Sequence, residues 1–468
     1  MEEVARFALD LCRSADYAEV RVQDFSSTGF VLRNGVPEAS GFDQTKGVAV
    51  RVLIKGALGF VCTNNLDKTN IKNVVSQALK IANYSSKFMT KKVEFSDEKS
   101  VKGKEIIKPQ KDPEDFSSDD KLKLLKELDK ELLAEKIKFN SREFSLGHSI
   151  KKELFMNSHG TLITKSIPRT NFFWFVTVDE KGKTKQRYMQ HDAVKGMEAI
   201  KEWNLHEEVI DNARALQKNL KFGKKVVEGV YDVICGPEVV GIAVHESAGH
   251  PYEADRIFGR ESAQAGESFV TKQMVNTKIG SSLVNVSDDP SIEGTSGYYM
   301  YDDDGVKSRK KIILKNGMIT EFLHNRESAK EMGVKSNGCA RASAYDREPI
   351  VRMANTYMEA GKSKKEDIIS SVKKGIYLKN FMEWNIDDKR YNQKYVGAEA
   401  YYVENGEIKH PLINPALEIT TPLFWSSVNM VGKDVERFSG SCGKGEPMQG
   451  IPVTMGGPTI KLSNIRIK

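Results

Sequence analysis

Two histidines and a glutamate within residues 245–250 are the side chains best suited to chemistry. The run His245-Glu246-Ser247-Ala248-Gly249-His250 reads HExxxH, one residue longer than the HExxH motif of common zinc peptidases. Imidazole nitrogens bind zinc, and a glutamate beside the first ligand can take a proton from the water that the ion activates. The pattern predicts a catalytic metal site with His245 and His250 as ligands and Glu246 as the general base.

The additional residue in this motif changes the geometry of the ligands. Residues at i and i+4 lie about 40° apart around an ideal helix, whereas residues at i and i+5 lie about 140° apart. His245 and His250 therefore cannot both reach one ion from a regular helix. We expect an interruption, either by a left-handed Gly249 with Pro251 disfavouring helical geometry at His250, or by a π-bulge across the motif.

A third ligand is needed, because a catalytic zinc ion keeps three protein ligands and one open position. The candidate is Cys442, in the run Phe438-Ser439-Gly440-Ser441-Cys442-Gly443-Lys444-Gly445. Glycine and serine favour a tight turn there, and a thiolate beside a cation has a depressed pKa and binds zinc well. From the residues alone, a buried apolar thiol is an equally good interpretation of Cys442.

The other cysteines and histidines show no comparable spacing. The five cysteines lie far apart and include no CxxC pair, so we expect no disulfide framework. We interpret four of the cysteines as small buried apolar residues and six of the histidines as structural residues. These are Cys12, Cys62, Cys235 and Cys339, and His148, His159, His191, His206, His324 and His410.

Composition excludes several classes of protein. Of the 468 residues, 39% are hydrophobic and 29% are charged, which is typical of a globular chain with two or three domains. A net charge of +7, spread over 71 basic and 64 acidic residues, is too small for a nucleic-acid footprint. No apolar run approaches the roughly 20 residues of a membrane span, and the acidic, amphipathic start lacks the cationic region of a signal peptide. We therefore expect a cytoplasmic protein that binds neither nucleic acid nor membranes.

In the first half of the chain, apolar periodicity predicts strands between helices. Alternation at 18–22 and 28–33 indicates two strands, and Asn34-Gly35 predicts a type I′ hairpin turn because both residues tolerate positive φ. The Lys-rich stretch 91–118 is expected to be a loosely packed connection before a helix that Ser117 or Ser118 caps. Further predicted helices are 4–14 and 67–82, and further predicted strands are 47–54, 59–62, 153–155, 161–165 and 171–178.

The second half begins with the elements that must position the metal motif. A strand at 231–235 leads through Pro237, which suits the first turn of a helix, into the helix that carries His245. Asn316-Gly317 and Asn405-Gly406 predict two more hairpins. Strands and helices mixed without regular βαβ alternation predict an α+β fold.

The predicted domain boundary lies at the polar, glycine-containing stretch 217–229. It separates an N-terminal α-β(several)-α domain, residues 1–216, from a larger, mixed and hairpin-rich metallopeptidase domain, residues 217–468.

The sequence resembles the TldD/PmbA family of metallopeptidases, once described as modulators of DNA gyrase, and specifically its catalytic TldD branch. In that family the two motif histidines and a C-terminal cysteine bind zinc, and the motif glutamate is catalytic. The resemblance thus assigns zinc to His245, His250 and Cys442, and catalysis to Glu246. It spans nearly the whole chain, through residues 18–22, 33–35, 47–52, 245–250, 301–305, 349–357, 403–406, 442–444 and 456–459.

The resemblance implies a peptidase that cuts unfolded or short peptides with little sequence preference. Members pair a catalytic subunit with a paralogue of the TldE/PmbA type that lacks the motif, so we expect a dimer with such a paralogue or with itself. A peptide held as an added β-strand would explain weak selectivity, because main-chain hydrogen bonds would carry the affinity. The sequence departs from the family at 393–397 and 422–425, where we expect changes in the substrate groove.

Two other functions remain open at this point. One is a non-catalytic regulator that binds another protein, of the gyrase-modulator type, which requires no metal. The other is a zinc hydrolase of a non-peptide amide, because metal-assisted attack by water is the same chemistry at either bond.

Overall fold

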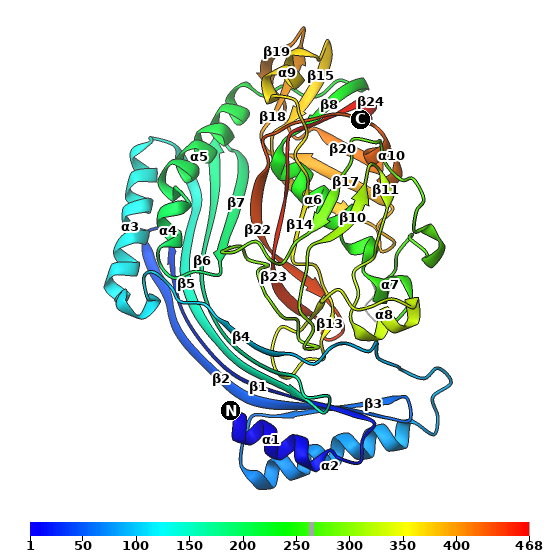
Figure 1. Cartoon of the computed structure of the whole chain (residues 1–468). Helices are drawn as coiled ribbons and strands as arrows, with labels where there is room; N and C mark the ends of the chain where they lie inside the picture. The colour runs from blue at the N-terminus through cyan, green and yellow to red at the C-terminus, as the bar shows by residue number, and fades with distance from the viewer. Residues whose placement is uncertain (262–265, 468) are drawn as a thin grey trace.

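The computed structural model describes residues 1–261 and 266–467. The chain has the predicted α+β fold, and its two halves differ in shape (Figure 1). A long, curved sheet from the first half wraps around a second half built of several smaller sheets. Within the described residues, no helix is both long enough and apolar enough to cross a membrane.

Seven strands form the curved sheet, in the order β3-β2-β1-β5-β6-β4, with β7 also paired to β6. β7 lies on the same side of β6 as β4, opposite β5, so it is an edge strand. The strands are β1 (Tyr17–Arg33), β2 (Val36–Ile54), β3 (Ala57–Thr63), β4 (Lys102–Ile106), β5 (Lys138–Asn157), β6 (Leu162–Glu180) and β7 (Lys183–Ala193).

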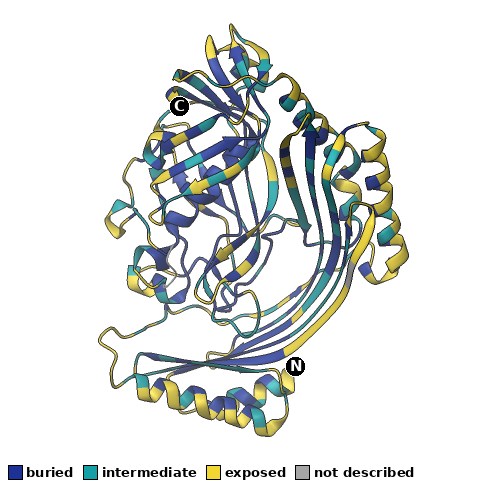
Figure 2. Cartoon of the chain, turned by 180° about the vertical axis from the view of Figure 1, so that it is seen from behind, coloured by how far each residue is buried: buried dark blue, intermediate teal, exposed yellow. Residues whose placement is uncertain are grey.

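Helices cover the convex face of this sheet at its two ends, and each end has its own hydrophobic core (Figures 1 and 2). One core lies under α1 and α2 and includes Val20 and Val50. The other lies under α3 and α5 and includes Phe144 and Trp174. The helices are α1 (Glu2–Leu11), α2 (Lys68–Ser85), α3 (Ser118–Ala134), α4 (Ala199–Glu202) and α5 (Leu205–Phe222).

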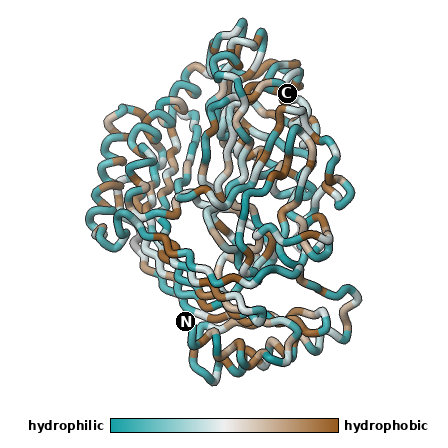
Figure 3. The backbone as a smooth tube through the Cα atoms, viewed as in Figure 1, coloured by the Kyte–Doolittle hydropathy of each residue, from teal (hydrophilic) through white to brown (hydrophobic). Residues whose placement is uncertain are grey.

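The second half contains two six-stranded sheets, ordered β11-β10-β9-β14-β23-β22 and β19-β18-β15-β8-β24-β21, with two smaller sheets. Its strands are β8 (Gly229–Cys235), β9 (Val286–Asp288), β10 (Lys311–Lys315), β11 (Met318–Ile319), β12 (Ala340–Arg341), β13 (Ile350–Val351), β14 (Asn355–Met358), β15 (Lys374–Leu378), β16 (Phe381–Ile386), β17 (Asn392–Gly397), β18 (Ala400–Glu404), β19 (Glu407–Pro411), β20 (Ala416–Thr420), β21 (Val428–Val431), β22 (Glu436–Lys444), β23 (Gln449–Gly457) and β24 (Ile460–Ile467). Its helices are α6 (Pro237–Ala248), α7 (Ala254–Ile257), α8 (Arg326–Met332), α9 (Lys365–Ser370) and α10 (Thr421–Ser426). The tube in Figure 3 shows apolar segments running through the interior of this half.

Local signals for turns and caps predict the structure well. In each of the three Asn-Gly pairs both residues have positive φ, and each pair joins two antiparallel strands, as predicted. Ser117 caps α3 by accepting a hydrogen bond from the backbone N–H of Asp120 at 3.1 Å. These features depend on neighbours in sequence, so the sequence alone specifies them.

Strand lengths were predicted less well. The two strands expected at 18–22 and 28–33 are one strand, β1, and those expected at 161–165 and 171–178 are one strand, β6. The connection expected at 91–118 contains β4, which pairs with β6. Strand β7 and helix α5 were not predicted. Helix α5 continues through residue 217, and the domain division placed there stays a prediction.

Buried ion pairs join the concave face of the curved sheet to the second half. Strand β1 alternates apolar residues that face α1 and α2 with charged residues, such as Glu19, that are also buried. Arg51 Nε lies 2.8 Å from Glu19 Oε1, and its Nη2 lies 2.5 Å from Asp304 Oδ1. Lys165 Nζ lies 2.9 Å from Asp303 Oδ1. Asp303 and Asp304 thus link the second half to both β2 and β6.

We predict that Arg51→Met destabilises the protein by about 3–5 kcal/mol, because it leaves Glu19 and Asp304 as buried carboxylates without their partner. The matched control is Arg33→Met. The Arg33 side chain is 46% exposed beside Glu143, and such pairs contribute about 1 kcal/mol or less. Guanidinium unfolding of both variants checks this, and equal losses would contradict a structural role for the buried pairs.

Candidate metal centre

Helix α6 carries the HExxxH motif and is buried along its length. Its first turn is fixed by Gly236, whose N–H donates to the Leu378 carbonyl at 2.8 Å, and by Pro237 at the first helical position. The helix packs closely on β23, because a Cβ on Gly241 would meet the Gly456 nitrogen at 3.1 Å. His245 and Glu246 lie in its last turn, with 4% and 7% of their surfaces exposed.

The helix is interrupted between the two histidines, but not in either of the predicted ways. Helix α6 ends at Ala248, and residues His250–Tyr252 form a single 3₁₀ turn. Gly249 has φ −112° and ψ −76°, so the expectation of a left-handed glycine was wrong, and so was the alternative of a π-bulge. Glycine is needed here for space, because a Cβ would lie 2.0 Å from Met353 Sδ and 2.7 Å from the His245 carbonyl oxygen.

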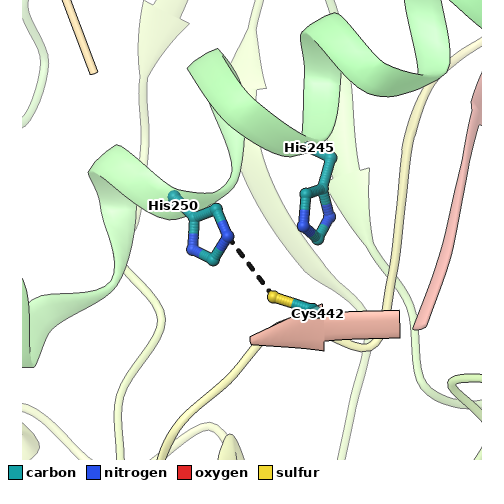
Figure 4. A group of neighbouring side chains, drawn as sticks. All are labelled: His245, His250 and Cys442. Atoms are coloured by element: carbon teal, nitrogen blue, oxygen red, sulfur yellow. Dashed lines mark hydrogen bonds between the residues drawn. The ribbon is translucent and has the colours of Figure 1, made fainter. Parts of the chain in front are cut away.

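This interruption brings the three predicted ligands together. The imidazole rings of His245 and His250 lie 4.8 Å apart between centroids and meet edge to face. Cys442 Sγ, on strand β22, lies 3.3 Å from His250 Nε2. Figure 4 shows both rings pointing from the helical segment toward the cysteine on the strand. One possible ligand atom from each residue lies within 4.8 Å of the others, and all three residues are buried.

The donor set fits a zinc ion. Imidazole nitrogen and thiolate sulfur are donors that bind zinc, at about 2.0–2.3 Å in tetrahedral geometry. His245 Nδ1 is buried without a hydrogen-bond partner among the described residues, whereas buried polar atoms are normally paired. Burial lowers the pKa of the His245 imidazole, which favours the neutral form that binds a metal. The described residues form no other His, Cys, Asp or Glu group of this kind.

Glu253 orients His250 and was not predicted. Its Oε2 lies 2.9 Å from His250 Nδ1, which leaves Nε2 directed toward the Cys442 sulfur. Burial raises the pKa of Glu253, but Lys444 and His250 together lower it well below the ordinary value, so the carboxylate is ionised. Lys444 Nζ lies 3.2 Å from Glu253 Oε2. The sequence did contain a signal for Glu253, because it follows His250 by three residues and a carboxylate beside a ligating histidine is common in metal sites.

The Cys442 thiol has a depressed pKa, and the groups that lower it are distant in sequence. Burial raises its pKa, but the charge and hydrogen bond of His250 and the charge of Arg352 lower it to about 7. The nearby cation in the sequence, Lys444, instead contacts Asp255 at 2.7 Å and the Val351 carbonyl at 2.7 Å. Arg352 also donates a hydrogen bond to the Cys442 carbonyl.

Glu246 is held by two residues that sequence reasoning missed. Arg390 Nη1 lies 2.6 Å from Glu246 Oε2, and Trp384 Nε1 donates to Glu246 Oε1 at 3.2 Å. Burial raises the pKa of Glu246, but His250, His245 and Arg390 outweigh this effect and lower it below the ordinary value. Trp384 and Arg390 belong to the hairpin of β16 and β17, and no local motif marks either of them.

A cavity of about 230 Å³ opens onto the candidate ligands and Glu246. Its walls come from α6, the β16–β17 hairpin and two edge strands, β7 of the curved sheet and β22. The two edge strands approach each other where Ser439 Oγ accepts a hydrogen bond from the Asp192 N–H at 3.1 Å. The site therefore lies where the two halves of the chain meet.

The remaining histidines and cysteines take no part in this group. Burial lowers the pKa of His148 and His324 to about 4, so both rings are neutral. Burial raises the pKa of Cys12 and Cys339 to about 12, as expected of inert thiols. The described cysteines form no disulfide.

Comparison with known proteins supports a metalloprotease. Three family sequence models match the chain: PmbA/TldA metallopeptidase domain 1 at residues 18–82, the central domain at 111–217 and the C-terminal domain at 228–468. A metalloprotease of Methanocaldococcus jannaschii is 33% identical over 96% of this chain and 97% of its own length. A zinc metalloprotease TldD homolog of Saccharolobus solfataricus is 33% identical over 56% of each chain.

Solved structures share the fold at low sequence identity. A protein described as a modulator of a DNA gyrase from Thermotoga maritima matches with a TM-score of 0.79 and 16% identity, over 100% of both chains. TldE from Thermococcus kodakarensis matches with a TM-score of 0.75 and 18% identity, over 100% of this chain and 99% of that one.

We predict that Gly249→Ala destabilises the protein by about 1–3 kcal/mol, because the added methyl group overlaps Met353 and the His245 carbonyl. The same displacement should move His250 away from Cys442 and weaken zinc binding. Gly29→Ala is the matched control, since a Cβ at Gly29 meets nothing within 4 Å. Chemical unfolding and equilibrium zinc titration of both variants provide the test. Wild-type stability in Gly249→Ala would show that the helix end tolerates a side chain.

Proposed function

Because the chain belongs to the PmbA/TldA metallopeptidase family, we propose that it is a zinc metallopeptidase of the TldD type. In this proposal His245, His250 and Cys442 hold the ion and Glu246 is the general base. The observation that carries it is the placement of three buried donor atoms within 4.8 Å of one another, on the wall of a cavity that Glu246 also lines. The combination of imidazole and thiolate favours zinc over manganese.

Bound zinc would supply a Lewis acid that polarises a peptide carbonyl and lowers the pKa of water. Glu246 would accept a proton as that water attacks the carbonyl carbon, and would donate it to the leaving nitrogen as the C–N bond breaks. The products are a carboxylic acid and an amine. The depressed pKa of Glu246 keeps it ionised and able to accept the proton, while Trp384 and Arg390 fix its orientation.

The substrates we propose are unfolded or short peptides bound as an added β-strand. Both β7 and β22 are sheet edges, and both line the cavity at the candidate metal centre. A peptide that pairs with either edge through main-chain hydrogen bonds would lie along the cavity that Cys442 and Glu246 also line. A folded protein keeps most of its extended segments paired or packed, so denatured chains should be cut and folded ones spared.

We further propose a cytoplasmic dimer, formed with a TldE/PmbA-type paralogue that lacks the motif or with a second copy. Two observations support the dimer. Residues 41–46 of β2 are exposed at a sheet edge, with Phe42 70% exposed, and such edges favour association. The chain also shares its fold with TldE. Light scattering that gives a strict monomer, alone and with such a paralogue, would contradict the dimer.

The two alternative functions differ from this proposal in measurable ways. A gyrase-modulator-type regulator needs no metal, and the buried His-His-Cys group argues against it. Metal analysis of the purified protein separates that regulator from either hydrolase. Digestion of casein then separates a peptidase from a hydrolase of non-peptide amides, which would leave casein intact.

We predict that Glu246→Gln keeps zinc content near wild type but lowers peptidase activity at least about 100-fold, because proton transfer by the carboxylate is lost. The matched control is Glu383→Gln, which removes an exposed carboxylate from the same hairpin as Trp384. Elemental analysis and casein digestion measure the two effects. Loss of zinc, or full activity, in Glu246→Gln would show that this residue has a different role.

We predict that zinc affinity weakens as the pH falls below about 7, by about tenfold per pH unit for each proton that competes with the metal. The sign follows from the Cys442 thiol, which is protonated below its pKa and must lose that proton to bind zinc. Cys442→Ala should lower zinc occupancy and activity, and the part of the pH dependence that comes from the thiol should disappear. The control Cys62→Ala should leave zinc occupancy, activity and the pH dependence unchanged. Competition with a chromophoric chelator across pH measures the affinity. An unchanged pH profile in Cys442→Ala would identify Cys442 as a structural thiol.

A further inference from the structure

The wall of the cavity at the candidate metal centre carries large apolar side chains beside its catalytic groups. Six of its large apolar side chains are partly exposed, and they share the wall with the buried Ile242 and with uncharged polar residues such as Gln190 and Ser441. The six come from four separate strands: β7, β16, β22 and β23. They are Met189, Phe381, Met382, Trp384, Phe438 and Met455.

The charged groups in this wall already have partners. Arg187 forms two hydrogen bonds with Glu238, at 2.9 and 2.5 Å, and Arg390 pairs with Glu246 at 2.6 Å. No described cation or carboxylate of the lining, outside the candidate metal centre, is left to pair with a charged substrate side chain. A buried charge without a partner is costly, so the cavity disfavours charged side chains.

Three of the six apolar residues are methionines, which affects how narrowly the cavity selects among substrate side chains. Methionine side chains are unbranched and polarisable, and they adapt to neighbours of different shape. Surfaces rich in methionine accordingly accept several apolar partners. The volume of about 230 Å³ is several times the roughly 30 Å³ share of one water molecule, so it can receive a side chain.

We propose that this cavity is a specificity pocket for a large apolar substrate side chain next to the scissile bond. The adjacency follows from the shared wall, because Trp384 contacts both the cavity and Glu246. The pocket accepts aliphatic and aromatic side chains alike and rejects charged ones. This inference rests on the proposed peptidase function and narrows its substrates from peptides in general to peptides with an apolar residue at one position.

The test uses zinc-loaded full-length protein and a mixture of unstructured synthetic peptides in which one position is varied among all residue types. Mass spectrometry locates the cut sites. Peptides with Leu, Met or Phe beside the cut should be cleaved at least about tenfold faster than those with Asp, Glu, Lys or Arg, a ratio that apolar pockets commonly reach. Cleavage without such a preference would overturn the pocket but leave the peptidase proposal standing. No cleavage of any peptide would instead count against the peptidase proposal.

A variant assigns the preference to this cavity. Met189→Glu places a carboxylate in the wall from β7, which belongs to neither the metal ligands nor the catalytic groups. It should shift the preferred residue from apolar to Lys or Arg, while Met189→Leu retains the wild-type pattern. The matched control is Met89→Glu, at a surface position 37% exposed and outside the cavity. An unchanged cut-site pattern in a folded, zinc-binding Met189→Glu protein would contradict the assignment to this cavity. If that variant fails to fold, the cut-site preference of the wild-type protein decides whether the pocket is selective.

Discussion

The five-residue separation of His245 and His250 is the constraint on which the structure of the site depends. A regular helix would place these side chains on different faces, so helix α6 must end between them. The consequences extend along the chain: residue 249 must be glycine because Met353 is so close, and His250 must be held from its other side by Glu253. A motif that looks like an extended HExxH therefore specifies a helix end as well as two candidate ligands.

Strand β22 completes this arrangement in two ways. It carries Cys442 toward the histidines, and two residues later it carries Lys444 to the carboxylate that orients His250. Because alternate residues of a strand point to the same face, both side chains reach the same side of the sheet. A shift of the strand by one residue would remove the thiol and the ammonium group together. The pairing of β22 with β23 therefore fixes the candidate ligand and its supporting ion pair as a unit.

The sequence allowed correct prediction of the features that depend on neighbours. The helix that carries the HExxxH motif, the strand and proline before it, the three Asn-Gly hairpins and the cap at Ser117 all depend on local signals. The features that were missed depend on distant contacts. Arg390 is 144 residues from Glu246 in sequence, and nothing near either residue records that they meet. Strand β1 was divided in two because Ser26 and Ser27 interrupt its apolar alternation. The two flanking strands, which pair with β1 along most of its length, keep this stretch extended.

Two separate cores pack against the curved sheet, but the same long strands contribute to both of them. This sharing limits how the protein can evolve by exchange of segments. Strand β1 pairs with β5 from Glu19 to Arg33, so it passes beneath both helical layers. A recombination point between the stretches matched by the first two family models would leave each long strand whole, but it would pair β1 of one protein with β5 of another, whose twist and register were selected separately. Insertion or replacement is easier in the helical layers, which touch one core each. The sheet should therefore be inherited as one block, although family comparison divides it into two.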